Sequence, residues 1–133
     1  MYNRFYPSDA GFTLVEILIA VSIIGILTGI ALPNYQDAVL TGRRGEAKAE
    51  LLSLAQRQAK WRMMHSTYAT LAELGGAAKN EDYTFTVINN TPTTFVITAE
   101  PTLARAQHKD RCGQLAINQD AILTSNRSAC PKP

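Results

Sequence analysis

The sequence has few of the residues from which enzyme active sites are usually built. It contains two histidines and two cysteines, and it has no phosphate-binding glycine loop, no nucleophile elbow and no histidine-rich metal cluster. Only His65 and His108 could act as histidine bases. His65 lies near the expected end of a helix, where a positive charge is favourable and a structural role is the simplest one. The sequence therefore predicts a protein that is not an enzyme and needs no cofactor or metal.

Charge is also sparse. Lys, Arg, Asp and Glu make up 18% of the 133 residues, and the formal net charge is only +2 at pH 7. A balance this mild does not by itself argue for binding to nucleic acid. The chain has no low-complexity segment and no internal repeat, and its length leaves room for one small domain.

What the sequence does contain is an almost unbroken apolar run from Phe12 to Leu32. About twenty residues in a helix span a hydrocarbon core of about 30 Å. The run is longer than the apolar part of a removable signal peptide, and no small-x-small cleavage pattern follows it. We therefore expect a retained membrane anchor. Its hydroxyl-bearing residues, Thr13, Ser22 and Thr28, can bond to carbonyls of their own helix and so cost little to bury.

Glu16 is the one carboxylate in this run. One interpretation is local: Thr13 caps the helix, and Glu16 reaches back from the third helical position in a capping box. A carboxylate also suits the positive end of the helix dipole. Neither effect explains a charge that must be buried in lipid or in a helix bundle, where it costs several kcal/mol. Glu16 is therefore a candidate functional residue.

Gly11 followed by Phe12-Thr13-Leu14-Val15-Glu16 resembles the processing site of type IV prepilins, which carry class III signal sequences. The resemblance implies that prepilin peptidase cuts after Gly11, removes residues 1–11 as a leader and methylates the new N-terminus at Phe12. It also implies that Glu16 meets the N-terminal amine of a neighbouring subunit in the filament core. Such a pair would set the register between subunits, because a misplaced subunit would leave two charges unpaired.

Gly25 and Pro33 fall where pilins commonly carry residues that weaken the helix. Proline costs about 3 kcal/mol inside a helix, and Gly25 and Gly29 each cost up to about 1 kcal/mol relative to Ala. By the resemblance, this stretch can melt when the filament assembles. The alternative is that the glycines let membrane helices pack closely, and the sequence leaves both open.

The resemblance also implies a location and partners. Before assembly the chain would cross the bacterial inner membrane once, with its head in the periplasm, and afterwards it would be part of the pilus at the cell surface. Its partners would be prepilin peptidase, the inner-membrane assembly machinery and other pilin subunits, which it would meet through its N-terminal helix. In this orientation Arg43 and Arg44 lie on the periplasmic side, against the positive-inside bias. The orientation therefore rests on the processing motif and not on the distribution of charge.

An amphipathic pattern follows the apolar run. On a helical wheel, one side collects Ala47, Leu51, Leu54, Ala55 and Trp61, with Leu52, Ala59 and Met63 widening it. The opposite side collects Glu46, Glu50, Ser53, Arg57 and Lys60. We therefore predict one long helix from Phe12 to about Met64, with a transmembrane and assembly part over residues 12–33 and an amphipathic part over residues 34–64. A soft point is expected near Gly42 and Gly45.

The remainder, residues 65–133, is predicted to be a globular head. A short helical turn closed by glycines is expected at 71–76. Alternating patterns rich in aromatic and β-branched residues predict a hairpin of strands at 83–88 and 94–99, a third strand at 113–118 and a short fourth strand at 121–124. Three or four antiparallel strands packed on an amphipathic helix make an α+β fold. This matches the pilin head that the N-terminus implies.

Cys112 and Cys130 bracket the last expected strands. Metal binding would need more ligands at closer spacing, and a redox pair would more commonly read Cys-x-x-Cys. A structural disulfide is favoured, and closing such a loop contributes about 3 kcal/mol. In type IV pilins a C-terminal disulfide of this kind bounds a variable region that faces partners, and here that region is short.

The leading functional hypothesis is a structural subunit of a type IV pilus. The small head favours a minor pilin of the type IVa class, PilE-like in kind, that supports pilus assembly and hence motility, adhesion or DNA uptake; an abundant major pilin is an alternative. Another is a competence pilin that binds DNA through basic residues that the disulfide would bring together: Arg105, His108, Lys109, Arg111, Arg127 and Lys132. No aromatic residue accompanies them, and a charged edge also serves solubility. The last alternative is a plain signal-anchored periplasmic domain, in which Glu16 would be dispensable.

Overall fold

The computed structural model describes residues 11–128 and 130. Contacts along the chain divide it after Gln36 into two compact units. We call residues 11–36 the anchor segment and the described residues from Asp37 onward the head unit. The predicted leader, apart from Gly11, and the basic residue Lys132 lie outside the described residues.

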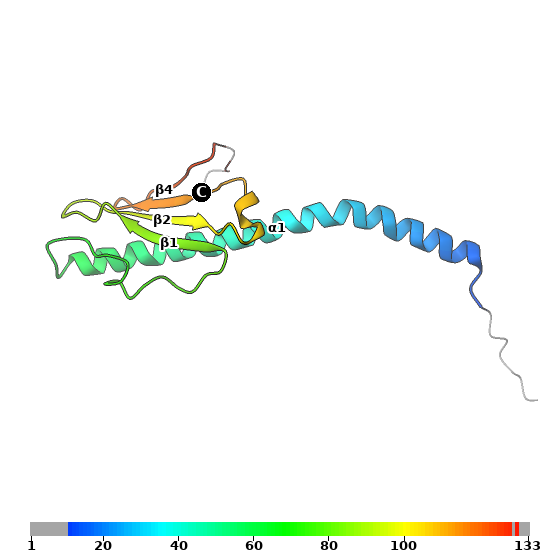
Figure 1. The fold of residues 1–133 in the computed structure, drawn as a ribbon, viewed down its shortest axis with the longest axis horizontal. Helices are drawn as coiled ribbons and strands as arrows, with labels where there is room; N and C mark the ends of the chain where they lie inside the picture. Colours follow the sequence, from blue (N-terminus) through cyan, green and yellow to red (C-terminus); the bar gives the residue numbers. More distant parts are fainter. Residues whose placement is uncertain (1–10, 129, 131–133) are drawn as a thin grey trace, which may run out of the picture. The chain divides into compact units, whose positions relative to one another are not determined.

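The long helix that the sequence predicts is present. Helix α1 runs from Leu14 to Arg62 (Figure 1). At its start, the Thr13 hydroxyl accepts a hydrogen bond from the Glu16 N–H at 3.2 Å, which confirms Thr13 as the N-cap. Gly42 and Gly45 both lie inside α1, so the expected soft point between its two parts does not interrupt the helix.

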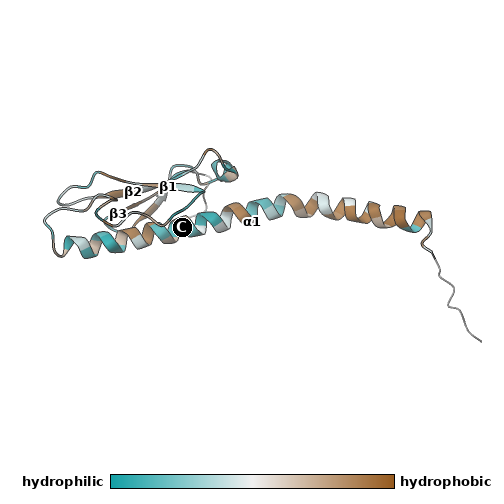
Figure 2. Ribbon diagram, turned by 60° about the horizontal axis from the view of Figure 1, so that its bottom comes forward, coloured by the Kyte–Doolittle hydropathy of each residue, from teal (hydrophilic) through white to brown (hydrophobic). Residues whose placement is uncertain are grey.

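Among the described residues, none covers the apolar side chains of the anchor segment. Its large apolar residues are between 50% and 80% exposed, and this part of α1 is mostly brown in Figure 2. In the described part of the chain, α1 is the one helix long and apolar enough to cross a membrane. The hydroxyls of Ser22 and Thr28 donate to the carbonyls four residues earlier, each at 2.7 Å, as the sequence predicts.

In the head unit, α1 contributes a narrow buried stripe. Three of its apolar residues are fully buried: Ala47, Leu51 and Leu54. Their spacing of four and three residues keeps them on one helix face, which confirms the centre of the predicted apolar side. The predicted widening of that side is wrong, because the stripe does not extend to the positions beside it. Those residues are exposed: Leu52, Ala59 and Met63.

Four antiparallel strands form the sheet in the order β1-β2-β3-β4. They are β1 (Tyr83–Ile88), β2 (Val96–Pro101), β3 (Leu115–Asn118) and β4 (Leu123–Ser125). The predicted meander and α+β fold are confirmed, although the last three strands begin two residues later than expected. Thr94 is held in the β1–β2 loop, because its N–H donates to the Thr91 hydroxyl at 3.0 Å. Gly113, with a φ of +61°, belongs to the turn before β3.

The core lies between one face of the sheet and α1 (Figure 1). Buried residues alternate along the strands, as expected for a sheet with one covered face. On β1 and β2 these are Tyr83, Phe85, Ile97 and Ala99, and on β3 they are Leu115 and Ile117. The alternation places the opposite face of the sheet, including Thr84 and Glu100, toward solvent.

The segment between α1 and β1 is tied to the helix by polar side chains. Gln58 is fully buried, and its amide donates to the carbonyl of Ala69 at 2.7 Å and accepts the Ala69 N–H at 2.8 Å. Arg57 donates to the carbonyls of Leu74 and Gly76 at 3.0 and 2.7 Å. Two glycines with positive φ, at +82° and +79°, close the predicted turn, and only glycine adopts such angles without strain.

Candidate functional site

The predicted processing site lies at the start of the described chain. Gly11 is exposed, and a Cβ added to it would meet no atom within 4 Å. Phe12 is 80% exposed. Nothing in the described part of the chain therefore requires glycine at position 11, so a need for glycine there would come from outside the packing of these residues.

Glu16 is exposed in the first turn of α1. Its backbone N–H is bonded to Thr13, but its carboxylate accepts no hydrogen bond and forms no ion pair among residues 11–128 and 130. Only one half of the expected capping box is therefore formed within the described chain. The carboxylate is left available to a partner outside it, which is what the predicted contact with a neighbouring subunit requires.

The predicted helix-weakening residues lie within α1. Pro33 is inside the helix, and a Cβ added at Gly25 or Gly29 would have nothing within 4 Å in this chain. Packing within the subunit therefore does not account for either glycine. Close packing against other helices and melting during assembly both remain consistent with their positions.

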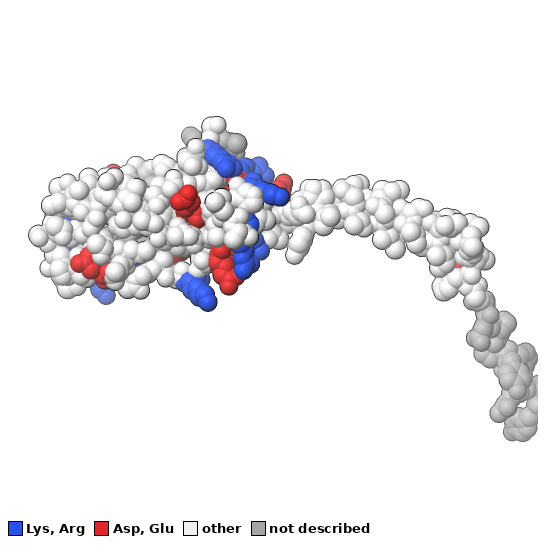
Figure 3. Space-filling view, in the orientation of Figure 1, with Lys and Arg blue, Asp and Glu red and all other residues white. Residues whose placement is uncertain are grey.

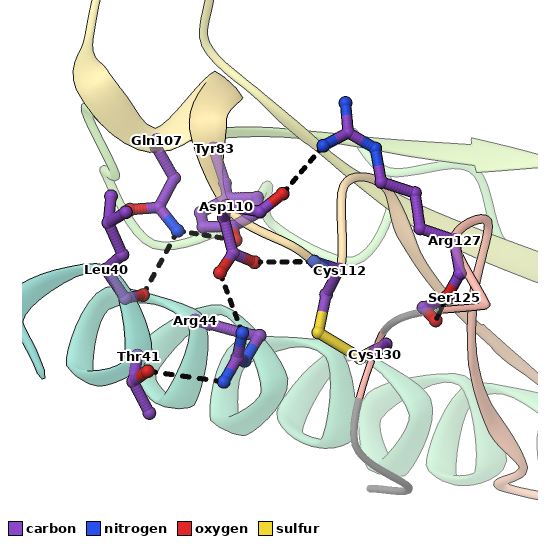
Figure 4. Close-up of polar contacts among 10 residues, drawn as sticks. All are labelled: Leu40, Thr41, Arg44, Tyr83, Gln107, Asp110, Cys112, Ser125, Arg127 and Cys130. Atoms are coloured by element: carbon purple, nitrogen blue, oxygen red, sulfur yellow. Dashed lines mark hydrogen bonds and ion pairs between the residues drawn. A yellow bond between two sulfur atoms is a disulfide. The ribbon is translucent and has the colours of Figure 1, made fainter. Parts of the chain in front are cut away.

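A buried polar cluster ties α1 to the C-terminal part of the head unit (Figure 4). Arg44 and Asp110 form an ion pair at 2.7 Å, with their side chains 8% and 3% exposed. The second carboxylate oxygen of Asp110 accepts the Cys112 N–H at 3.3 Å, and Arg44 also donates to the Thr41 hydroxyl at 3.4 Å. Such a pair costs desolvation, and losing either partner would leave an uncompensated buried charge.

Gln107 and Tyr83 extend this cluster. Gln107 is fully buried, and its amide donates to the Leu40 carbonyl at 3.2 Å and to the Tyr83 hydroxyl at 2.9 Å. Burial raises the pKa of Tyr83 above its usual value of 10.0, and the hydrogen bond from Gln107 opposes this rise. Tyr83 is therefore a neutral hydrogen-bonding residue near neutral pH.

The predicted disulfide between Cys112 and Cys130 is formed. Cys112 is fully buried beside the Asp110 cluster. Arg127 also contacts this cluster, because its guanidinium donates to the backbone carbonyl of Asp110 at 2.8 Å. The disulfide and this bond bring the segment after β4 against residues 110–112, as the sequence predicts (Figure 4).

Four of the predicted basic residues make up what we call the basic surface: Arg105, Lys109, Arg111 and Arg127. All four are exposed, and Figure 3 shows Lys and Arg side chains gathered over the end of the head unit where the short helix η1 (Ala106–Lys109) lies, with acidic side chains among them. Arg105 pairs with Glu81. In the part of the chain that the structure describes, Lys109 and Arg111 have no carboxylate within 4 Å.

A hollow of about 260 Å³ adjoins the basic surface. It lies where β2 ends, β3 begins and the chain leaves β4. Its walls carry both polar and apolar groups and belong to Glu100, Pro101, Leu103, His108, Gly113, Gln114, Asn126 and Arg127. We call this feature the polar hollow.

The two histidines both make local contacts. The His65 ring stacks on Trp61 with 3.8 Å between ring centroids, and its Nδ1 lies 3.0 Å from the Trp61 carbonyl oxygen. The Nδ1 of His108 lies 2.6 Å from the Arg105 carbonyl oxygen. Within residues 11–128 and 130, no group of three or more His, Cys, Asp or Glu side chains is placed to hold a metal ion.

Four buried polar residues are not among the site residues predicted from the sequence: Arg44, Gln58, Gln107 and Asp110. Arg44 and Gln58 lie on the same helix face as Ala47, Leu51 and Leu54. A polar side chain in line with an apolar stripe was the signal that could have identified them. Gln107 and Asp110 carry no such signal, because they lie in and directly after η1, a short helix that the sequence pattern does not predict.

Two family models match the chain. The model described as "Type IV minor pilin ComP, DNA uptake sequence receptor" matches residues 33–116. The model described as "Prokaryotic N-terminal methylation motif" matches residues 7–32. Together they cover the predicted processing site, α1 and most of the sheet.

Curated relatives are type IV pilins. The major pilin protein PilA of Myxococcus xanthus is 40% identical over 76 residues, which are 56% of this chain and 34% of PilA. A fimbrial protein of Neisseria meningitidis serogroup A is 36% identical over 74 residues, or 54% of this chain and 42% of the relative. The chain thus matches less than half the length of these relatives.

Solved structures have the same fold. A type IV pilin from Shewanella oneidensis superposes with a TM-score of 0.52, at 23% identity, over 69% of this chain and 98% of that pilin. The non-core minor pilin PilV of Neisseria meningitidis gives a TM-score of 0.58, at 19% identity, over 73% of this chain and 99% of PilV. At these identities the likeness concerns the fold.

Proposed function

The chain belongs to the family of type IV minor pilins described as ComP, DNA uptake sequence receptor, and on this premise we propose that it is a minor pilin whose head binds DNA. It is a structural subunit of a type IV pilus with a prepilin methylation motif and an apolar N-terminal helix suited to membrane anchoring. The observation that carries the DNA-binding proposal is the pair Lys109 and Arg111. Both are exposed, lie within the matched region and have no carboxylate partner in the described chain.

The basic surface supports phosphate binding in two ways. Lys109 and Arg111 meet a phosphate without first breaking an ion pair within the described residues. Arg105 is paired with Glu81, but both side chains are about half exposed, at 46% and 60%. An exposed pair of this kind is worth about 0–1 kcal/mol, so exchanging Glu81 for a phosphate costs little.

Binding through so few charges is expected to be modest and sensitive to salt. Each neutralised phosphate contributes about 0.9 to the slope of log affinity against log salt concentration. Contacts of this type supply non-specific dissociation constants of about 10⁻⁴ to 10⁻⁶ M at physiological salt. A filament that carries the subunit would then hold DNA reversibly.

For assembly, we infer that prepilin peptidase cuts between Gly11 and Phe12, methylates Phe12 and so prepares the subunit for the filament. The chain would cross the inner membrane once, with its head in the periplasm, until the assembly machinery extracts it. The exposed apolar surface of the anchor segment and the unpaired carboxylate of Glu16 support packing against the N-terminal helices of other pilins.

The test compares two double variants of the full chain in non-ionic micelles. Lys109→Ala/Arg111→Ala removes the two basic residues without a carboxylate partner, and Lys60→Ala/Lys79→Ala removes the same charge from exposed positions outside the basic surface. Gel-shift titrations of a fluorescent duplex at several salt concentrations give affinity and salt slope. We expect the first variant to bind more weakly, with a slope smaller by about 2, and the second to behave as the unaltered chain. Equal loss in both variants, or no shift of the duplex by the unaltered chain at low salt, would refute the proposal.

A further inference from the structure

We propose that Asp110 is a positioning residue, which together with its buried neighbours holds Lys109 and Arg111 in place for phosphate. This inference rests on the proposed function, because it concerns how the two phosphate-binding side chains are fixed. Lys109 and Arg111 are exposed. Three other residues of the 107–112 segment are buried: Gln107, Asp110 and Cys112. The segment thus presents its two charges to solvent and is held by the residues between and beside them.

Asp110 lies between the two basic residues and uses all of its polar atoms in hydrogen bonds. One carboxylate oxygen pairs with Arg44 of α1 at 2.7 Å, and the other accepts the Cys112 N–H at 3.3 Å (Figure 4). Its N–H donates to the Gln107 carbonyl at 3.0 Å. Its carbonyl accepts a bond at 2.8 Å from Arg127, which lines the polar hollow. The backbone at position 110 is therefore fixed from α1, from within the segment and from the chain after β4.

Two further contacts hold the ends of the segment. At its start, the buried side chain of Gln107 donates to the Leu40 carbonyl of α1 at 3.2 Å and to the Tyr83 hydroxyl at 2.9 Å. At its end, Cys112 is joined to Cys130 by the disulfide. Helix α1, strand β1 and the chain after β4 thus all hold this short segment.

This fixing affects affinity because a flexible loop loses entropy when it binds. Ordering the loop and its side chains costs free energy and so weakens binding. Lys109 and Arg111 are separated by one extended residue, with a φ of −57° and a ψ of 138° at Asp110, so their Cα atoms lie at most about 7 Å apart. Phosphates of one DNA strand follow each other every 3.4 Å or so, about one per base pair along the helix axis. Two cations fixed at this spacing can meet one strand without reordering of the backbone.

A purely electrostatic role of Asp110 predicts the opposite effect on DNA binding. If only charge counted, removing an acidic residue between two phosphate-binding residues would strengthen binding. A positioning role predicts that its removal weakens binding, although the basic surface becomes more positive. Replacing Arg44 and Asp110 together leaves the net charge unchanged and avoids a buried charge without a partner. The double replacement therefore isolates the effect of positioning.

The experiment measures duplex affinity and its salt dependence for the full chain in non-ionic micelles. Arg44→Met/Asp110→Asn removes the ion pair between the segment and α1, and Gln107→Met removes the second contact without a change of charge. Arg43→Met/Asp82→Asn is the matched control, because it removes another ion pair between α1 and the rest of the head unit. We expect both test variants to bind about tenfold more weakly. Their salt slope should be that of the unaltered chain, because both cations still meet phosphate, and the control should bind as the unaltered chain does.

A coupling experiment distinguishes positioning from general destabilisation. In the Lys109→Ala/Arg111→Ala background, measured at low salt, Arg44→Met/Asp110→Asn should cause no further loss, because its effect acts through those two residues. NMR relaxation should also show more ps–ns motion of the backbone amides of Lys109 and Arg111 in the test variants than in the control. Thermal unfolding identifies a variant that fails to fold, and the other test variant then carries the comparison.

The outcomes separate this inference from the proposed function. If a folded test variant binds duplex as tightly as the unaltered chain, or if the loss is equally large in the background without Lys109 and Arg111, positioning by Asp110 is wrong and DNA binding stands. Mobile amides at these two residues in the unaltered chain would also refute positioning, whether or not any variant folds. If the unaltered chain binds no duplex at low salt, both proposals fall.

Discussion

The anchor segment and the head unit differ in how far the described chain itself buries their apolar side chains. In the head unit, Leu51, Leu54, Ile97 and Ile117 are at most 1% exposed. In the anchor segment the large apolar residues are at least half exposed. Burial stabilises by about 25 cal/mol per Å² of apolar surface. The head unit gains this within one chain, whereas the anchor segment gains it only from lipid or from other subunits.

The charged residues of the two regions also differ in where they find a partner. Arg44 is buried in the head unit and has its partner, Asp110, in the same chain at 2.7 Å. Glu16 lies in an apolar helix and has no charged partner within residues 11–128 and 130. The buried charge of the head unit is thus paired within the chain, whereas the carboxylate of the anchor segment can be paired only by another molecule. The predictions below test this contrast, beginning with the largest expected effect.

Arg44→Ala should destabilise the head unit strongly. It leaves Asp110 as a buried charge without its partner, so we expect the free energy of unfolding to fall by about 3–5 kcal/mol. Urea denaturation of the full chain in micelles, followed by the fluorescence of the single tryptophan, Trp61, measures the change. Arg43→Ala, which removes the more exposed pair with Asp82, should cost about 1 kcal/mol or less. Equal losses in the two variants would contradict the role of the buried pair.

Removing the disulfide should affect the head unit somewhat less. Cys112→Ala/Cys130→Ala frees the chain across a sequence separation of 18 residues, and we expect a loss of about 3 kcal/mol. The same denaturation experiment measures it, with the reduced unaltered chain as a second sample. If the variant and the oxidised chain unfolded at the same urea concentration, the bond would be dispensable for stability.

Glu16→Gln should leave the head unit folded and weaken the packing of the anchor segment against other subunits. The amide keeps the size of the side chain and removes the charge that would meet a neighbouring amine. We expect normal membrane insertion and a roughly tenfold lower content in filaments, equivalent to about 1.4 kcal/mol. Immunoblots of membranes and sheared pili give both quantities. Ser22→Ala is the control, because that hydroxyl bonds within its own helix. Normal pilus content of Glu16→Gln would overturn the charge-pair hypothesis.

The smallest expected effect is on alkaline stability. Because burial raises the pKa of Tyr83 in the folded state, its contribution is fully present below its unfolded pKa of about 10 and is lost as pH rises through the higher folded pKa. We expect the unaltered chain to weaken above about pH 10 more than Tyr83→Phe does. Tyr35→Phe, at an exposed position of the anchor segment, should follow the unaltered chain. Identical pH profiles for all three would refute this.

The sequence predicted most of the fold because local patterns determine it. Alternation placed β1 at its observed bounds, and helical spacing identified Ala47, Leu51 and Leu54 as core. The later start of β2 depends on hydrogen bonds between Thr91 and Thr94 in the loop before it. Loop contacts of this kind do not alter the pattern of apolar residues, so periodicity cannot locate them.

The candidate site was predictable in part. The processing motif, the cysteines and the four basic residues are visible in the sequence, and the predicted disulfide is formed. The ion pair of Arg44 joins residues 66 positions apart, and the side chains of Arg127 and Asn126 lie so close to Gly113 that an added Cβ there would come within 3 Å of both. Both arise from tertiary packing, which residue spacing does not encode.

The central claim is that the chain is processed at Gly11 and completed by other pilin subunits in a filament. Quantitative mass spectrometry of sheared surface filaments tests it most directly. The account predicts an N-terminal peptide that begins at methylated Phe12, at a small fraction of the major subunit. Absence of that peptide from filaments, with the intact leader peptide recovered from membranes, would contradict it.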